Sequence, residues 1–371
     1  MYETREAERA LLIGVKVRGT QDGWGLDESL DELEQLALTA GAEVVGRLSQ
    51  HLARPSPRFY IGEGKVKEAV ALQGTLGHNL IICDEELSPV QGRNLELSLG
   101  LKVIDRTALI LDIFARRART REGQLQVELA QHQYLLPRLA GRWPHLERLG
   151  GGIGTRGPGE SQLETDRRLI RGRIQRLTKL LEEVRRQRSL HRQQRRRTGV
   201  PVVSLVGYTN AGKSTLFNAL CRADVFVEDK LFATLDPTTR RLRLPGDMAA
   251  FLTDTVGFIQ KLPPSIVAAF RATLEELEDA SLLLHVVDIT HPLAPRHFRT
   301  VEETLQGLGL EGKPRVLVLN KIDLLPDGRG STTDGRGLGE AVAVSALQGW
   351  GLEELRRRIA ACLRETGVAP P

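Results

Sequence analysis

The chain has 371 residues, of which 41% are apolar and 27% charged, and its net charge is +5. This length exceeds one ordinary hydrophobic core, so two or three folded domains are expected, and the composition excludes a disordered chain. No run of about 20 apolar residues predicts a membrane span, and the charged residues 1–6 do not resemble a secretory signal. Three widely separated cysteines without a CxxC pair indicate a reducing compartment and no structural zinc site. We therefore expect a cytoplasmic protein, with peripheral membrane association left open.

The first third of the chain alternates two kinds of hydrophobic pattern. Short apolar runs at residues 11–17, 42–48, 80–84 and 101–104 are typical of buried strands. The segments between them carry apolar residues at helical spacing, over residues 30–39, 64–72 and 90–99. Strands that alternate with helices favour a parallel sheet. Residues 1–105 are therefore predicted to form a small parallel α/β domain.

The next segment, residues 106–198, is predicted to be a helical hairpin. Residues 107–139 read as a helix with a basic cluster in the middle, at residues 116–121. Six glycines among the eleven residues 149–159 exclude a regular element there. Residues 160–197 then carry apolar side chains at intervals of three and four, which predicts one long helix. Residues 125–139 are expected to supply its antiparallel partner, with the glycine loop at the tip.

The long predicted helix is strongly basic. Residues 166–197 hold thirteen Lys and Arg against three Asp and Glu, a local balance of +10 that leaves −5 for the rest of the chain. Such a segment on an acidic protein is typical of contact with a polyanion, although arginines can also simply solvate an exposed face. No aromatic residue lies within 160–197, so RNA would be recognised by shape and phosphate rather than base stacking. The candidate RNA contacts are Arg156, Arg185, Arg186 and Arg188.

A phosphate-binding loop follows an apolar strand at residues 200–206. The sequence fits G-x-x-x-x-G-K-[ST] and continues as a helix over residues 216–220, the context that gives this motif its meaning. Backbone N–H groups can converge there on the β-phosphate, Lys213 can reach the β- and γ-phosphates, and the Ser214 hydroxyl can bind Mg²⁺. The predicted phosphate-binding residues are Gly207, Tyr208, Thr209, Asn210, Ala211, Gly212, Lys213, Ser214 and Thr215.

Two further segments are predicted to respond to the γ-phosphate. A strand at residues 249–253 ends in Asp254, which can hold Mg²⁺ through a water, and the N–H of Gly257 can sense the γ-phosphate. In the preceding polar connection Thr234 is the expected direct Mg²⁺ ligand, with Thr238 and Thr239 as alternatives. The switch I residues are Phe232, Ala233, Thr234, Leu235 and Asp236, and the switch II residues are Asp254, Thr255, Val256 and Gly257.

The base-recognition segments favour guanine over adenine. A strand at residues 315–319 leads to Asn320, Lys321 and Asp323. The Asp323 carboxylate can accept hydrogen bonds from guanine N1 and N2, a donor pair that adenine lacks, so discrimination is expected to be strong. Together with the segment after the strand at residues 341–344, the predicted guanine-binding residues are Asn320, Lys321, Asp323, Ser345, Ala346 and Leu347. Residues 199–365 are thus predicted to be a P-loop GTPase domain, followed by a short tail at 366–371.

The predicted hydrolytic machinery is incomplete. Many related GTPases place a glutamine directly after Asp-x-x-Gly to orient the attacking water, but this chain has Phe258 there. We therefore expect slow intrinsic hydrolysis that a partner stimulates. The amide of Asn210 stands where a K⁺ ion could bind against the phosphates, and Gln260 could enter on a rearranged loop.

Several motifs together resemble the HflX family of translational GTPases. They lie at residues 117–123, 125–130, 154–160, 207–215, 232–236, 254–258 and 269–274. The stretches outside the GTPase domain are the more specific ones, because many GTPases share the nucleotide motifs. The resemblance implies binding to the large ribosomal subunit, GTPase activation by it and separation of stalled ribosomes into subunits. It also implies that the hairpin and its glycine loop contact ribosomal RNA. Some members carry a further C-terminal domain, for which this sequence shows no counterpart.

Two other functions remain compatible with the sequence. One is a ribosome-assembly GTPase that binds precursor RNA, and the other is a signalling GTPase whose basic helix contacts an acidic protein or an anionic membrane. The helix lacks a Trp/Phe face, which weakens the membrane alternative. The partners expected are GTP or GDP with Mg²⁺ and the large ribosomal subunit, and the protein is expected to be a monomer.

Overall fold

The computed structural model describes residues 8–19, 24–141, 158–197, 199–221, 231–263, 266, 277–325 and 341–365. These residues form two compact units, each with its own sheet. The first unit takes the described residues of Met1–Arg116, Gln124–Leu181 and Pro263–Ala269, and the second those of Arg117–Gly123, Glu182–Leu262 and Phe270–Pro371.

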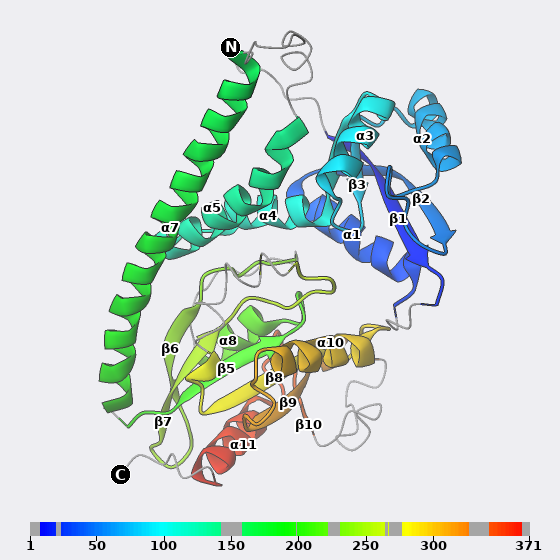
Figure 1. The fold of residues 1–371 in the computed structure, drawn as a ribbon. Coiled ribbons are helices and arrows are strands. Elements are labelled where there is room, and N and C mark those ends of the chain that lie inside the picture. The colour runs from blue at the N-terminus through cyan, green and yellow to red at the C-terminus, as the bar shows by residue number, and fades with distance from the viewer. Residues whose placement is uncertain are drawn as a thin grey trace, which may run out of the picture. The chain divides into compact units, whose positions relative to one another are not determined.

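The sheet of the first unit has four parallel strands in the order β2-β1-β3-β4. The strands are β1 (Arg9–Val17), β2 (Glu43–Leu52), β3 (Leu80–Cys83) and β4 (Lys102–Asp105). Helices α1 (Leu26–Ala40), α2 (Glu63–Leu76) and α3 (Pro89–Leu99) connect them (Figure 1). The predicted parallel α/β fold of this part is confirmed.

The alternation of side chains along β1 divides the packing between the two sheet faces. Leu11, Ile13 and Val15 join a buried cluster with residues of α2 and α3. On the opposite face the missing side chain of Gly14 admits α1, because a Cβ there would meet the Leu26 side chain at 2.8 Å. Hence both faces of this sheet are covered by helices, as parallel sheets require.

One helix was expected over residues 107–139, but the structure has two and a 3-10 turn. They are α4 (Arg106–Arg117), α5 (Arg121–Leu135) and η1 (Leu136–Gly141). The interruption follows from the side chain of Thr120, whose hydroxyl accepts the N–H of Gly123 at 3.0 Å and so caps a new helix. Hydrophobic periodicity continues through such a short break and does not reveal it.

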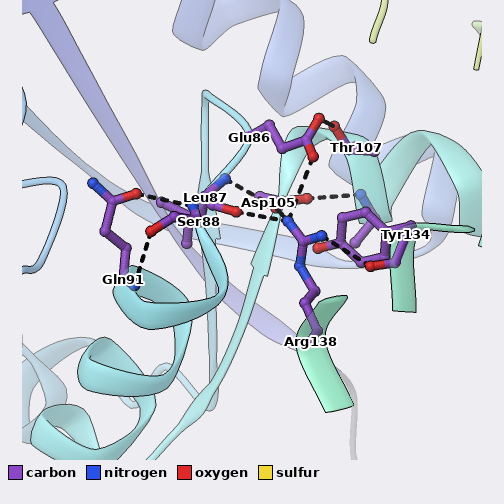
Figure 2. Close-up of polar contacts among 9 residues, drawn as sticks. Glu86, Leu87, Ser88, Gln91, Asp105, Thr107, Tyr134 and Arg138 are labelled. Atoms are coloured by element: carbon purple, nitrogen blue, oxygen red, sulfur yellow. Dashed lines mark hydrogen bonds and ion pairs between the residues drawn. The ribbon is translucent and has the colours of Figure 1, made fainter. Parts of the chain in front are cut away.

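The end of α5 and the turn η1 are fixed to the sheet by a buried polar network (Figure 2). At the end of β4 the Asp105 carboxylate accepts the N–H groups of Leu87 at 3.0 Å and Ala108 at 2.8 Å. Arg138 donates to the same carboxylate at 3.1 Å and to the Leu87 carbonyl at 2.6 Å, and its guanidinium lies over the Tyr134 ring. Asp105 is 1% exposed, and burial raises its pKa.

The long basic helix predicted for residues 160–197 is present as α7 (Pro158–Arg197). Leu177 and Leu181 are buried as the periodicity predicts, whereas Leu169 is 65% exposed and lies outside the packed stripe. Arg173 of α7 forms an ion pair with Glu128 of α5, at 2.6 Å. The predicted glycine loop lies outside the described residues as far as residue 157.

The second unit has a six-stranded sheet in the order β10-β9-β8-β5-β7-β6, in which only β6 is antiparallel to its neighbour. Its strands are β5 (Val202–Gly207), β6 (Thr238–Arg243), β7 (Ala249–Asp254), β8 (Leu282–Asp288), β9 (Arg315–Asn320) and β10 (Ala341–Ala343). Within its described residues the helices are the part of α7 from Glu182 onward, α8 (Lys213–Cys221), α10 (Ala294–Gly307), the 3-10 turn η2 (Ile322–Leu324) and α11 (Leu352–Glu365).

Helices cover both faces of this sheet as well (Figure 1). Phe217 of α8 and Ile359 of α11 join one buried cluster with β5 and β8. Ala294 of α10 belongs to a second cluster with β8 and β9, and Phe298 of α10 stacks on His285. The carboxyl ends of the parallel strands are the edge at which such sheets bind ligands. Among the described residues, no helix is long and apolar enough to cross a membrane.

Candidate nucleotide-binding site

The phosphate-loop motif lies between β5 and α8, in the strand–loop–helix context that the sequence predicts. Two glycines are required here by close approaches. A Cβ on Gly207 would lie 2.3 Å from the Val286 carbonyl oxygen. A Cβ on Gly212, at φ +89°, would lie 2.2 Å from the side-chain nitrogen of Asn320. The loop can therefore curl tightly enough for its N–H groups to face one point at the start of α8.

Lys213, the first residue of α8, is 6% exposed, and its ammonium lies beneath the loop. It donates to the carbonyls of Tyr208 at 2.8 Å and Gly207 at 3.1 Å. Burial lowers its pKa to about 8, although the Asp254 carboxylate acts in the opposite direction. An anionic phosphate beside this ammonium would stabilise its charged form.

Three oxygen atoms from separate segments converge beside Lys213. The Ser214 hydroxyl lies 2.7 Å from the Thr234 hydroxyl and donates to the Asp254 carboxylate at 2.7 Å, while Thr234 donates to the same carboxylate at 3.0 Å. Asp254 is fully buried, burial raises its pKa, and its Oδ1 accepts no hydrogen bond from the described residues. The alternative hydroxyl of Thr239 is instead bonded to that of Thr253, between β6 and β7.

The other end of the site is organised by Asn320, at the end of β9. Its side-chain nitrogen donates to the Ala211 carbonyl at 2.9 Å, and its oxygen accepts the N–H of Ala346 at 3.0 Å. One buried amide thus joins the phosphate loop to the segment after β10. Asp323 lies in η2, and Leu347 is 75% exposed.

Asp288 is a site residue that the sequence reasoning missed. Its Oδ2 forms an ion pair with the Lys321 ammonium at 2.8 Å, and its Oδ1 accepts the N–H and hydroxyl of Thr290. The ion pair fixes the direction of the Lys321 side chain, whose backbone is left-handed at φ +68°. A carboxylate at the carboxyl end of β8, next to the strand that carries Asn320, was the available signal.

One pocket of about 220 Å³ lies between the phosphate loop, the two switch segments and the base-recognition segments. It is lined by residues of every predicted nucleotide segment, namely Thr209, Asn210, Gly212, Lys213, Ser214, Thr215, Phe232, Ala233, Thr234, Thr255, Gly257, Asn320, Lys321, Asp323, Leu324, Ala346 and Leu347. Larger hollows occur in the first unit, but no phosphate loop lines them.

Phe258 packs against the back of the phosphate loop instead of facing the pocket. It is 2% exposed, its carbonyl accepts the N–H of Thr209 at 2.7 Å, and its own N–H donates to Gly207 at 3.1 Å. Gln260 is 6% exposed, and its N–H donates to the Tyr208 hydroxyl. The residues that directly follow switch II therefore support the phosphate loop.

The candidate RNA contacts on α7 differ in exposure. Arg186 is exposed, whereas Arg185 is only partly exposed. The side chain of Arg188 and the whole of Arg156 lie outside the described residues.

Comparisons with known proteins agree with this architecture. Family models described as GTP-binding GTPase N-terminal, GTP-binding GTPase Middle Region and 50S ribosome-binding GTPase match residues 27–115, 117–195 and 202–321. The GTPase HflX of Caldanaerobacter subterraneus subsp. tengcongensis is 54% identical, over 86% of this chain and 74% of that protein. The GTPase HflX of Lacrimispora saccharolytica is 50% identical, over 99% of this chain and 86% of that protein.

The chain belongs to the HflX family of GTPases. The GTPase HflX of Escherichia coli K12 is also similar, with 48% identity over 88% of this chain and 76% of that protein. A crystallised GTP-binding protein of Sulfolobus solfataricus in complex with GDP has 26% identity and a TM-score of 0.48, over 96% of this chain and 99% of that one. The family models and the HflX relatives confirm the expected family, the α/β fold with a P-loop GTPase domain and the GTPase activity.

Proposed function

We propose that this HflX family GTPase binds GTP and Mg²⁺ in the pocket of the second unit and is activated by the large ribosomal subunit. The main support for this proposal is the convergence of three oxygens beside the buried Lys213 at one end of the site, with Asn320 and Asp323 at the other. A guanine nucleotide has a polyanionic end and a donor-rich base edge, so it complements both ends.

The residues fit a magnesium ion. Hydroxyl and carboxylate oxygens are the ligands that Mg²⁺ prefers. Ser214 and Thr234 would bind it directly, and Asp254 would act through a water. The buried Oδ1 of Asp254 has no hydrogen-bond partner in the part of the chain that the structure describes, which supports this role because such an atom needs a partner. The ion would neutralise charge that develops on the phosphates.

The remaining site residues take the roles that their chemistry suggests. Residues 207–215 would enclose the β-phosphate with N–H groups, and Lys213 would neutralise its charge. The N–H of Gly257 would sense the γ-phosphate. Asp323 would read the N1 and N2 donors of guanine, the Lys321 stem would cover the ring, and residues 345–347 would face the O6 atom.

The ribosome role rests on the family and on the charge of α7. The family model that matches residues 202–321 is described as a 50S ribosome-binding GTPase. The thirteen basic residues of 166–197 offer a complementary surface for RNA phosphate, with Arg156, Arg185, Arg186 and Arg188 as proposed contacts. Separation of stalled or idle ribosomes into subunits is the proposed outcome of this binding.

The deciding measurement is the GTP hydrolysis rate with and without purified large ribosomal subunits. A rise with the subunit is expected, since Phe258 offers no group to orient water. Co-sedimentation should be stronger with a non-hydrolysable GTP analogue and be lost in the variant R185E/R186E/R188E. An unchanged rate would favour a signalling role, and preferential binding to immature particles would favour assembly.

Potassium is proposed as a second cation beside Asn210, whose backbone is left-handed at φ +60° in the phosphate loop. Hydrolysis should be faster in KCl than in NaCl of equal ionic strength. Equal rates in the two salts would exclude the proposal.

A further inference from the structure

Switch I makes a second set of contacts two residues after Thr234. The Asp236 Oδ2 atom accepts the backbone N–H groups of Arg119 at 2.7 Å and Thr120 at 2.8 Å. Its Oδ1 atom accepts the hydroxyl of Thr120 at 2.5 Å. Both oxygens of one switch I carboxylate are thus bonded to the segment that precedes α5, a segment that belongs to the same compact unit as switch I.

The segment is shaped to receive this carboxylate. Thr120 directly precedes α5, at the helix end where N–H groups lack partners within the helix and the helix dipole favours negative charge. Gly123 lies one turn into the helix, and a Cβ there would be only 2.3 Å from the Asp236 Oδ1 atom. The absence of a side chain at position 123 therefore permits the approach of Asp236.

The contact bears directly on the geometry of the pocket. Thr234 and Asp236 are separated by one residue, Leu235, which is 2% exposed and so fixed by its packing. The hydroxyl of Thr234 reaches Ser214 and Asp254 on one side of this short segment, and Asp236 reaches Thr120 on the other. Anchoring Asp236 consequently restricts where the Thr234 hydroxyl can lie.

We propose that Asp236 is a positioning residue that holds Thr234 in its metal-binding position by bonding to residues 119–123. The middle region, whose family match begins at residue 117, thereby completes the GTP site. This inference rests on the proposed role of Thr234 as a Mg²⁺ ligand. Thr120 lies in the basic cluster 116–121, and Gly123 lies beside that cluster. Under this proposal both residues act in GTP binding rather than in RNA contact.

The test measures the Mg²⁺ concentration that half-saturates binding of a fluorescent non-hydrolysable GTP analogue, alongside the affinity for GDP. Asp236→Ala and Asp236→Asn should each raise that concentration about tenfold, as expected for losing a charge-assisted anchor. Single-turnover GTP hydrolysis should slow in parallel. GDP affinity should not change, because without a γ-phosphate Thr234 is not required as a ligand.

Gly123→Ala tests the same contact from its other side. The added methyl should displace the Asp236 carboxylate and raise the Mg²⁺ requirement as Asp236→Ala does, although alanine favours the helix itself. The double variant G123A/D236A should be no worse than either single variant, because both remove one interaction. Gly172→Ala is the matched control, since it is an exposed helical glycine with no atom within 4 Å of its added Cβ.

Thr234→Ala separates the two possible failures. If it leaves the Mg²⁺ requirement unchanged, the proposed metal ligand is wrong and this inference falls with it. If T234A raises the requirement but D236A, D236N or G123A does not, the metal assignment stands and the positioning role is overturned. Additive effects of G123A and D236A would also overturn it.

Discussion

At the scale of single residues, the nucleotide pocket is defined by polar atoms held in place by other polar atoms. Asn320 is fixed by Ala211 and Ala346, and Lys321 is fixed by Asp288. Such supporting contacts determine affinity because a flexible side chain must lose its freedom when it binds. Residues that orient a nucleotide-contacting side chain should therefore affect the affinity for nucleotide without touching it.

Asp288→Asn should weaken GDP and GTP binding equally, by about threefold to tenfold. Asparagine keeps an acceptor for Thr290 but loses the ion pair that orients Lys321, and the guanine base is common to both nucleotides. Titration with fluorescent GDP and GTP analogues measures the effect, with Asp236→Asn as a contrast that should affect the GTP analogue alone. Unchanged affinities would show that Lys321 needs no anchor.

His297 gives the second unit an acid-sensitive stability. Its ring stacks on Tyr208 of the phosphate loop at 3.9 Å between centroids, and burial followed by the nearby His291 lowers its pKa from 6.5 to about 3. Between those values the unfolded chain binds a proton that the folded protein does not. The contribution of His297 to stability is therefore expected to be constant above about pH 7 and to fall as the pH drops below 6.5, by about 1.4 kcal/mol per pH unit.

His297→Phe should keep the stacked ring and remove this pH dependence. Urea unfolding of the variant and the parent at several values between pH 4.5 and 7.5 provides the measurement. The two chains should differ in slope below pH 6 and agree in slope above pH 7. Parallel curves over the whole range would contradict the assignment.

At the scale of elements, capping and burial of charge decide where helices start and how they are fixed. Thr120 splits the expected helix of residues 107–139 into α4 and α5, and Arg138 ties the end of α5 and η1 to β4 through Asp105. The basic residues of η1 and α7 thus have different roles. Arg138 has a side chain only 17% exposed and is structural, whereas Arg186 of α7 is exposed.

Arg138→Met should destabilise the first unit by about 2–4 kcal/mol, because it leaves the buried Asp105 carboxylate without its cation. The double variant D105N/R138M should lose less, since the uncompensated charge is then gone. Calorimetry with and without GDP measures the loss, because GDP raises the unfolding temperature only of the unit that binds it. Equal losses for the single and double variants would argue against the buried pair.

At the scale of the whole molecule, charge is segregated along the chain. The +10 balance of residues 166–197 contrasts with a net charge of +5 for all 371 residues. Binding to RNA through such a segment releases counterions, so its affinity must fall steeply with salt. The same segregation keeps the remainder of the protein acidic and so discourages nonspecific binding elsewhere on it.

If α7 makes the proposed contact with the large subunit, replacing Arg185, Arg186 and Arg188 by glutamine should flatten the salt dependence of that binding. Each lost phosphate contact removes about 0.7–0.9 from the slope of log K against log salt, so a reduction of about 2 to 3 is expected. Affinity measured across a series of KCl concentrations gives the slope. Arg240→Gln, on the exposed part of β6 outside this segment, is the control that should leave it unchanged.

The sequence by itself determined much of this protein. Local patterns predict strands, helices and nucleotide motifs, because alternation, periodicity and glycine placement reflect contacts among neighbours in the chain. The strands of the first sheet, four strands of the second and the helix α7 were therefore predicted to within a few residues, whereas β6 and β8 were missed. The sequence also predicted that residues 207–215, 254–257 and 320–323 belong to one site.

Tertiary structure alone decided which residues far apart in the sequence come together, both beside that pocket and within the first unit. Asp288 orients Lys321, Asp236 bonds to Thr120 across 116 positions of sequence, and Arg138 reaches Asp105 from the end of another helix. The position of Asp288 at the end of a strand was a signal for a site residue, but no local pattern marks its partner or the other two pairs. An acidic residue in a polar loop looks the same whether it faces solvent or a partner. Only the packing of separate segments brings the two charges or dipoles within hydrogen-bond distance, and that packing is set by the whole fold.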